Sequence, residues 1–530
     1  MPKKPAAKKE KRASSECKAV IEIGSNALRL KVAQARKNKM EYVESITYDL
    51  NLGRDTFGTV TSGAALSGDG GRIQFDNLEK ICGIIKNFLA AASGYGCEEI
   101  KIVATTAIRE ATNKEYILDQ IKIKTALNVE VIDDAQEKLY IFKFMASLLN
   151  DALKKSTFLV YIGSGSMGLS YMTEGRIPYA QNIRTGSLRI SEMFNELQEY
   201  SSEFHLVVEE YLNGFTDGLA ENIPGPVKDF VASGQEISMI AELCGARDDG
   251  LFLYIPRENF TQMYEEIKHK SVDNIALDYR LPTDKAEVLL PAMAIFNRLM
   301  EITGANQIIS PAILLSDALM YEMLYPKAFA ELNKDFSKST VLYARRVASR
   351  YGTPEFHYAK VERYALKIFD KMKKIHGMGQ HEKLLLSTAA ILHDVGKFIN
   401  FKHHYRHSYN IITGLDILGL SNLDREIVAC ICYYHSTCLP SIHDEHYKSL
   451  SAQDRVLVSK LTAILRAADA LVRGSGEKFD SIDVTVSDEL VVTISTEQNI
   501  DLEQWAFNKK SDLFEEVFGL KARLRNKRPL

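Results

Sequence analysis

The amino-acid sequence predicts an α/β protein that is followed by an all-α region and a small C-terminal α+β segment. Between residues 18 and 325, short apolar runs that end in Gly/Ser turns alternate with helical patterns, which is typical of α/β proteins. Between residues 335 and 480, the sequence instead shows helical runs with a concentration of histidines. A chain of 530 residues is long enough for several domains that each bury a core.

The α/β part contains strands and helices in alternation. Predicted strands lie within residues 17–33 (two strands joined by a turn), 100–104, 129–132, 158–162 and 227–232, and predicted helices cover 75–92, 287–303 and 315–324. Three strands run into glycine-containing turns, which are Gly24-Ser25-Asn26, Gly163-Ser164-Gly165-Ser166 and Ser233-Gly234. Glycine lets the backbone approach an anion closely, so these turns favour phosphate binding, although strands also end in such turns without a ligand.

Composition limits the possible classes of protein. A net charge of −3 argues against a dedicated nucleic-acid surface. The seven cysteines have no framework spacing, which predicts reduced thiols in a cytoplasmic protein. No run reaches the ~18 apolar residues of a transmembrane segment. Residues 1–17 are basic and lack the apolar stretch of a signal peptide, so we expect a disordered arm, with the gathering of polyanions as an alternative role.

The histidines indicate a metal site. Ten of the twelve lie between residues 357 and 446, and His393-Asp394 places an imidazole next to a carboxylate. His357 in an upstream helical run and Asp469 in a downstream one can complete the ligand set. This order resembles the HD superfamily of metal-dependent phosphohydrolases, which implies a bound Mn²⁺, Fe²⁺, Zn²⁺ or similar ion. The alternative is that His393-Asp394 only caps a helix or completes a buried polar network.

A second metal and a phosphate contact are also predicted in this region. His407 and His435 are the candidates for a second, bridged ion, with a single ion as the alternative, and His403 or His404 could replace His407. Lys397 can steady a substrate phosphate as a point charge, or it can be a solvated lysine at the end of a helix.

Several motifs resemble the exopolyphosphatase/guanosine pentaphosphate phosphohydrolase (Ppx/GppA) family in its long form. They are IEIGSNALRL at 21–30, ATTAIREATN at 104–113, GSGS at 163–166, RTGSLR at 184–189 and the C-terminal stretch 505–519. The resemblance covers nearly all of residues 18–520. It implies two actin-like, sugar-kinase-like (ribonuclease H-like) lobes at 18–135 and 136–325, an HD-type helical domain at 335–480, a C-terminal segment at 481–530, and a homodimer.

The resemblance also implies a set of site residues. Phosphate contacts are expected from Gly24, Ser25, Asn26, Arg29, Arg109, Gly163, Gly165, Ser166 and Gly234. For Arg29 and Arg109 the alternative is a surface salt bridge. Guanidinium and backbone N–H groups bind phosphate without hydrolysing it.

The acidic positions of that family are only partly retained. Glu22 stands where the family has Asp, and the catalytic glutamate falls on Gln136, so that Glu137 is the candidate catalytic carboxylate. Tyr161 and Gly168 replace two acids that would hold Mg²⁺. Mg²⁺ in this N-terminal cleft is therefore the alternative cofactor to the ion of the HD-type site. Restoring acids at Gln136, Tyr161 and Gly168 is expected to raise Mg²⁺-dependent hydrolysis.

Three functions follow, in order of preference. The first is a phosphohydrolase acting on polyphosphate or guanosine penta- or tetraphosphate, with the HD-type metal site as the hydrolytic centre and the N-terminal cleft binding phosphate. The second is an exopolyphosphatase that works through the N-terminal cleft with Glu22 and Glu137. The third is a non-enzymatic regulator that binds polyphosphate or guanosine tetraphosphate.

Overall fold

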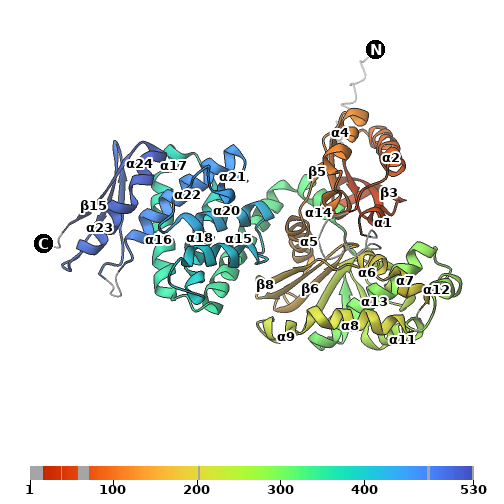
Figure 1. Cartoon of the computed structure of the whole chain (residues 1–530). Helices are drawn as coiled ribbons and strands as arrows, with labels where there is room; N and C mark the ends of the chain where they lie inside the picture. The colour runs from red at the N-terminus through yellow and green to blue at the C-terminus, as the bar shows by residue number, and fades with distance from the viewer. Residues whose placement is uncertain (1–15, 37–38, 58–70, 201–202, 474–477, 528–530) are drawn as a thin grey trace, which may run out of the picture. The chain divides into compact units, whose positions relative to one another are not determined.

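The computed structural model describes residues 16–36, 39–57, 71–200, 203–473 and 478–527, coloured along the chain in Figure 1. Nearly all of the predicted basic arm lies outside these residues. The chain divides into two compact units, Met1–Leu169 with Asn182–Asn333 and Ser170–Gln181 with Lys334–Leu530. Among the described residues, no helix combines the length and the apolar character needed to cross a membrane.

The first unit begins with a five-stranded sheet in the order β3-β2-β1-β4-β5. Strands β1, β2 and β3 are antiparallel, whereas β1, β4 and β5 are parallel. The strands are β1 (Lys18–Ile23), β2 (Ala27–Arg36), β3 (Lys39–Asp49), β4 (Glu99–Ala104) and β5 (Glu130–Val131). Five of the six residues of β1 are buried, because this strand has neighbours on both sides and its Ala19, Ile21 and Ile23 side chains join the core that includes α2.

A second sheet of this unit contains the strands that end in the remaining glycine turns. Its order is β10-β11-β12-β9-β6, and β6 and β9 are parallel with Ile162 opposite Gly234. The strands are β6 (Ser156–Ile162), β9 (Asp229–Gly234), β10 (Arg247–Asp248), β11 (Leu253–Pro256) and β12 (Gln307–Ser310), and the chain also forms β7 (Met167–Thr173) and β8 (Arg176–Ile183). All seven residues of β6 are buried.

Helices accompany both sheets, as the alternating pattern predicts. They are α1 (Leu52–Phe57), α2 (Phe75–Gly94), α3 (Thr106–Glu110), α4 (Lys114–Thr125), α5 (Asp134–Leu148), α6 (Ser187–Met193), α7 (Asn195–Tyr200), α8 (Phe204–Thr216), α9 (Leu219–Asn222), α10 (Ile237–Leu243), α11 (Arg257–Ile267), α12 (Val272–Tyr279), α13 (Thr283–Thr303) and α14 (Leu315–Leu324). Helix α14 has the predicted bounds, whereas α13 starts four residues before the predicted Glu287 because Pro282 initiates it.

The second unit is mainly helical. Its elements are the C-terminal part of α15 (Pro326–Arg350), then α16 (Glu355–Lys371), α17 (Lys373–His376), α18 (Gln380–Leu392), the 3₁₀ helix η1 (Val395–Phe398), α19 (His404–Thr413), α20 (Asn422–Tyr434), α21 (Glu445–Lys448) and α22 (Ala452–Ala470). An α+β segment follows, with β13 (Asp483–Val486), β14 (Glu489–Ile494), α23 (Asp501–Lys510), α24 (Asp512–Phe518) and β15 (Lys521–Asn526). The predicted order of an α/β part followed by a helical part is therefore confirmed.

The C-terminal segment shares one core with the helices that precede it. Helices α23 and α24 contact α22, and Phe507 and Phe514 are fully buried in the same apolar cluster as Leu392 and Ile464. Burial of large aromatic side chains contributes several kcal/mol, in the range of ~3–5 for each such residue lost. The C-terminal segment is thus an integral part of the helical unit, and this places α23 next to the histidine-rich region.

Candidate metal centre and phosphate cleft

Three helices of the second unit position the histidine cluster. His393 and Asp394 follow directly after α18, whose last eight residues are all buried, so the end of this helix is firmly held. Helix α16 carries His357 and α22 carries Asp469. The three helices pack on one another, and their apolar side chains belong to one core. The buried packing of α16, α18 and α22 therefore brings together ligands that are far apart in the sequence.

Gly396 allows a fourth helix to join them. A Cβ atom at this position would lie 2.1 Å from the backbone oxygen of His404 and 2.4 Å from the backbone nitrogen of Ser408. The Gly396 N–H donates to Ser408 Oγ at 3.0 Å, and Ser408 in turn donates to the His393 carbonyl at 2.7 Å. This close approach explains the glycine after His-Asp in physical terms, because any side chain would push α19 away from Asp394.

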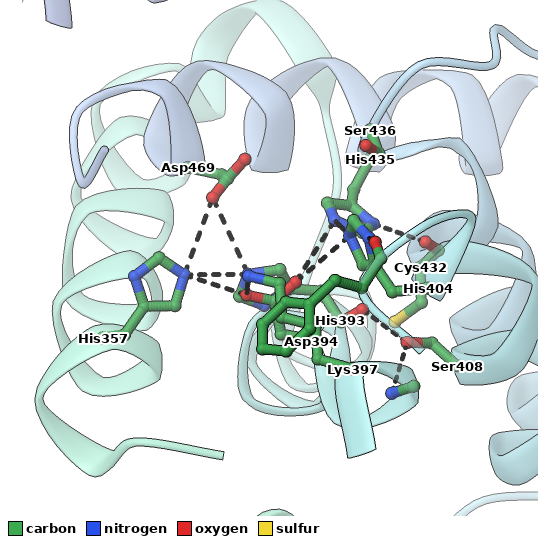
Figure 2. Close-up of polar contacts among 12 residues, drawn as sticks. His357, His393, Asp394, Lys397, His404, Ser408, Cys432, His435, Ser436 and Asp469 are labelled. Carbon is green, nitrogen blue, oxygen red and sulfur yellow. Dashed lines mark hydrogen bonds and ion pairs between the residues drawn. The ribbon is translucent and has the colours of Figure 1, made fainter. Parts of the chain in front are cut away.

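The first group of possible ligands consists of His357, His393 and Asp394. His357 Nε2 lies 3.3 Å from His393 Nε2 and 3.2 Å from Asp394 Oδ2. Asp469 Oδ1 lies 3.7 Å from both imidazole nitrogens. Figure 2 shows His357 and Asp469 on one side of Asp394, with both rings turned toward the Asp469 carboxylate.

The second group consists of Asp394, His404 and His435. Here the other oxygen of the same carboxylate is used, since Asp394 Oδ1 lies 3.3 Å from His404 Nε2 and 3.7 Å from His435 Nε2. The two imidazole nitrogens are 3.2 Å apart. In Figure 2 these two rings lie on the side of Asp394 away from His357. Asp394 is therefore placed between two adjacent ligand groups.

Backbone contacts orient three of the imidazoles toward these groups. His393 Nδ1 donates to the Ala390 carbonyl at 2.8 Å, His404 Nδ1 to that of Phe401 at 3.0 Å, and His435 Nδ1 to that of Cys432. A proton held on Nδ1 leaves the Nε2 lone pair free to bind a metal. In each pair of neighbouring imidazoles the two Nε2 atoms lie 3.2–3.3 Å apart. Lone pairs that face one another at this distance favour a cation between them. This donor set fits a borderline divalent metal.

The protonation states of these imidazoles and of Asp394 also suit metal binding. Burial lowers the pKa of His393 to about 3 and that of His404 to about 4, and the attraction of Asp394 only partly opposes this. Burial alone would raise the pKa of Asp394, but the surrounding histidines outweigh it and hold the pKa well below its ordinary value. Near neutral pH the imidazoles are thus neutral and the carboxylate is charged, which is the form that ligates a metal.

Acid is therefore expected to destabilise the metal-free protein. Between pH 6.5 and about 3 the unfolded chain protonates His393 while the folded chain does not, so the free energy of unfolding falls as pH falls through this window. The loss is about 1.4 kcal/mol for each pH unit from this residue. Denaturant unfolding of EDTA-treated protein at pH 7, 6 and 5 measures it. His393→Gln should weaken the dependence of the free energy of unfolding on pH. The control His443→Gln, at an exposed histidine, should leave this dependence unchanged. The same pH dependence in both variants would refute the assignment to His393.

The structure brings together five of the six predicted metal residues. His357, His393, Asp394, His435 and Asp469 lie in one cluster. The sixth, His407, belongs to neither ligand group found among the described residues, and His404 stands in its place. The reason is that His407 packs its Cβ against Gly396, whereas His404 is the first residue of α19 and faces Asp394.

Two cations that the sequence did not indicate hold Asp469. Lys510 at the end of α23 is buried, pairs with Asp469 Oδ2 and donates to the His435 carbonyl at 3.0 Å. Burial lowers the pKa of Lys510 to about 8 against the attraction of Asp469. Arg473 lies 3.0 Å from the same Asp469 oxygen. These contacts leave Asp469 Oδ1 directed toward His357 and His393.

A cavity of about 590 Å³ opens onto the cluster. Lys397, which pairs with Asp394, and Arg473 supply positive charge to its wall. Its rim contains three exposed phenylalanines, with fractional exposures of 53% for Phe356, 66% for Phe398 and 80% for Phe401. The space at the cluster thus combines anion-binding groups with an aromatic edge.

In the first unit, the glycine turns after β1, β6 and β9 converge. Arg29 Nη1 lies 3.4 Å from Glu22 Oε1, and Arg29 Nη2 donates to Gln235 Oε1 at 3.3 Å. Ser164 also donates to Gln235 Oε1, at 3.0 Å. Ser25 Oγ accepts a hydrogen bond from the Ala107 N–H at 3.1 Å. The turns that contain the predicted residues Gly24, Asn26, Gly163, Gly165, Ser166 and Gly234 therefore lie near Arg29, and phosphate binding by them stays a prediction.

Arg109, the second predicted guanidinium, is held beside the start of α5. It donates to the Ile132 carbonyl at 2.8 Å and to Thr106 Oγ1 at 3.0 Å, and it lies 3.5 Å from Asp134 Oδ1. Asp134 also accepts from Ser166 Oγ at 2.6 Å. Arg29 and Arg109 are thus both bound within the cleft, and neither is the exposed salt bridge that was the alternative.

The altered acidic positions have different surroundings. Gln136 closes a capping box at the start of α5, where its Oε1 accepts from the Asp133 N–H at 3.2 Å. Tyr161 is buried, and Gly168 packs against Lys138 and Phe142. Glu137 is buried beside Lys138 at 3.4 Å, and burial raises its pKa although Lys138 opposes this. The candidate catalytic carboxylate is therefore already paired with a cation.

The chain is similar to known proteins over both its α/β part and its helical part. Residues 32–326 match the Ppx/GppA phosphatase family, and residues 342–516 match Ppx/GppA phosphatase, domain III. The chain is 21% identical over 459 residues to the guanosine-5'-triphosphate,3'-diphosphate pyrophosphatase of Vibrio vulnificus, covering 84% of this chain and 86% of that enzyme. It is 26% identical over 203 residues to the bifunctional 3-dehydroquinate synthase/phosphatase of Fusobacterium nucleatum, a match to 37% of this chain but only 29% of that longer protein.

A solved structure supports the fold. The exopolyphosphatase of Cytophaga hutchinsonii superposes with a TM-score of 0.52 at 17% identity, covering 58% of this chain and 98% of that one. The likeness supports the predicted actin-like pair of lobes for the α/β part. At this identity it extends to the fold alone.

Proposed function

The chain belongs to the Ppx/GppA phosphatase family, and from this premise we propose that it is a metal-dependent phosphohydrolase whose hydrolytic centre is the histidine cluster of the second unit. The observation that carries the proposal is the position of Asp394, whose two carboxylate oxygens face two separate groups of imidazole ligands. The arrangement of His, His-Asp and Asp on three packed helices supports an HD-type centre.

The cluster can hold one ion or two. His357, His393, Asp394 and Asp469 would hold the first, and Asp394, His404 and His435 the second. A Mn²⁺, Fe²⁺, Zn²⁺ or similar ion bound there would supply the positive charge that polarises a phosphate and acidifies a water.

The protein's own groups position the substrate and the ligands. The backbone carbonyls of Ala390, Phe401 and Cys432 accept hydrogen bonds that orient three of the imidazole rings. Lys510 pairs with Asp469 Oδ2 and so holds this carboxylate in place. Lys397 and Arg473 lie at the wall of the cavity, where their charges can bind the phosphate groups of a substrate.

The aromatic rim favours a guanosine nucleotide over inorganic polyphosphate as the substrate. Phe398 and Phe401 expose most of their surface beside the cavity, although burial of such rings would normally be favourable. A base that stacks on an aromatic side chain gains about 1–3 kcal/mol, whereas polyphosphate has no group that can stack. This choice also agrees with the activity in the name of the Vibrio vulnificus relative.

Phosphate release by the metal-loaded full-length protein tests the proposal, with guanosine penta- and tetraphosphate compared with polyphosphate. We expect the double variant Phe398→Ala/Phe401→Ala to lower kcat/KM for the guanosine nucleotides by about 10-fold or more and to leave any polyphosphate hydrolysis unchanged. Phe75→Ala, which removes an equally exposed phenylalanine from the first unit, is the matched control. Equal losses on both substrates, or activity on polyphosphate alone, would contradict the assignment of a nucleotide substrate.

We further propose that the N-terminal cleft binds phosphate without hydrolysing it. Gln136 caps α5 where the family has its catalytic glutamate, and the neighbouring Glu137 is paired with Lys138 through Oε1, which disfavours its use as the general base of an exopolyphosphatase reaction. A non-enzymatic regulator is the remaining candidate, and phosphate binding with no release from any substrate in the panel would favour it.

A further inference from the structure

A lysine is buried beside the glycine turn after β6. The side chain of Lys138 on α5 is only 2% exposed, whereas lysine is almost never fully buried unless it is paired. Its Nζ lies 3.3 Å from Asp134 Oδ1 and 3.4 Å from Glu137 Oε1, and it donates to Ser166 Oγ at 2.8 Å. The ammonium group therefore sits among three oxygen atoms from α5 and from the glycine turn after β6.

Tyr161 and Gly168 make room for this lysine. The Nζ of Lys138 lies 5.3 Å from the centre of the Tyr161 ring, within the range of a cation–π contact. A Cβ atom at Gly168 would lie 2.8 Å from Lys138 Cγ and 3.0 Å from Cδ, so the absence of a side chain at 168 is a condition for the observed position of Lys138. Lys138 thus packs against Tyr161 and Gly168, two of the three positions where the sequence lacks the acids of its family.

The remaining oxygens do not fit a divalent metal. Such an ion needs several free oxygen ligands around one point. Asp134 Oδ1 already accepts from Lys138 and Ser166 and lies 3.5 Å from Arg109, and Glu137 Oε1 lies against Lys138. The buried Glu137 Oε2 accepts no hydrogen bond from the described residues, but a single free oxygen does not make the ligand set of a divalent ion. Glu22 is engaged on both oxygens, with Arg29 and with the Ser316 N–H.

We propose that the ammonium group of Lys138 is the resident cation of the N-terminal cleft and takes the place of a divalent metal ion there. The cluster then needs no added metal to balance Asp134 and Glu137, and phosphate that binds in this cleft does so without a bridging metal. The inference concerns the first unit only and does not depend on hydrolysis at the histidine cluster.

Mn²⁺ binding tests the proposal, measured by titration calorimetry on the full-length chain with His357→Ala and Asp394→Ala to remove the metal centre of the second unit. This parent should bind no Mn²⁺ in the N-terminal cleft. Adding Lys138→Met, which keeps the side-chain length and removes the charge, should create one new Mn²⁺ site per chain, and adding Asp134→Asn as well should abolish it. Lys138→Arg, which keeps the charge, should create none.

Lys143→Met is the matched control, because Lys143 is a second buried lysine on the same helix but lies over the Phe329 ring instead of in the cleft. It should gain no Mn²⁺ site. If Lys138→Met does not fold in the parent, it is made in the otherwise unchanged protein, where it should bind one ion more than the wild type. The proposal is overturned if the parent binds Mn²⁺ that Asp134→Asn removes, or if a folded Lys138→Met protein gains no ion.

Discussion

Replacing Asp394 by alanine is expected to remove bound divalent metal from both ligand groups at once and to abolish hydrolysis. Asp394 is a member of both groups, with Oδ2 near His357 and Oδ1 near His404. Loss of a residue that only orients a metal ligand costs 10–100-fold in metal affinity, so loss of a shared ligand should cost at least about 10²-fold. Elemental analysis of purified protein and phosphate release from guanosine pentaphosphate measure the two effects.

Two histidine variants give this experiment its controls. His404→Ala should lower the metal content by the ion of the second group only, because His404 contacts Asp394 Oδ1 and His435 but neither His357 nor Asp469. His407→Ala should keep the full metal content and activity, since His407 is in neither group. Equal metal content in the Asp394→Ala protein and the wild type would show that the histidine cluster is a polar network that binds no metal. Full activity of the metal-free wild-type protein would lead to the same conclusion.

The chain order of the metal residues could be predicted because it depends on helices that local sequence patterns reveal. His393-Asp394 ends an apolar helical run, and His357 and Asp469 lie in other runs whose buried faces must pack against it. The choice between His404 and His407 could not be predicted. It depends on where α19 begins, and this is set by a left-handed backbone at His403 (φ 59°) and by the close approach of α19 to Gly396.

Contacts made across long stretches of chain gave no signal in the sequence. Lys510 reaches Asp469 only because α23 packs on α22, and a lysine in the last turn of a helix normally remains in solvent. By contrast, the neighbouring turns after β6 and β9 follow from the parallel pairing of these two strands, whereas the turn after β1 belongs to the other sheet. The position of Lys138 could not be predicted, because a lysine next to Glu137 would ordinarily be solvated. The sequence alone reveals that positions 161 and 168 lack acids. That the ammonium group of Lys138 takes the place of the metal those acids would hold follows only from how Lys138 packs in the structure.

Lys138 also determines which substitutions would restore hydrolysis in the N-terminal cleft. We expect the triple variant Gln136→Glu/Tyr161→Asp/Gly168→Glu to remain inactive, contrary to the expectation from sequence alone, because any side chain at 168 meets Lys138 Cγ at 2.8 Å. Adding Lys138→Ala frees this space and removes the ammonium group that lies beside Asp134 and Glu137. The quadruple variant should therefore gain Mg²⁺-dependent polyphosphate hydrolysis, on the order of 10²-fold above the triple variant if a carboxylate then acts as a general base.

The comparison is made in an Asp394→Ala background, so that phosphate release cannot come from the second unit. Lys143→Ala added to the triple variant is the control for the loss of a buried lysine from α5, and it should give no activity. The gain should also depend on Mg²⁺ and disappear with EDTA, because the new carboxylates act as metal ligands only once the ammonium group is gone. Hydrolysis by the triple variant that matches the quadruple one would mean that Lys138 neither blocks position 168 nor holds the place of a metal.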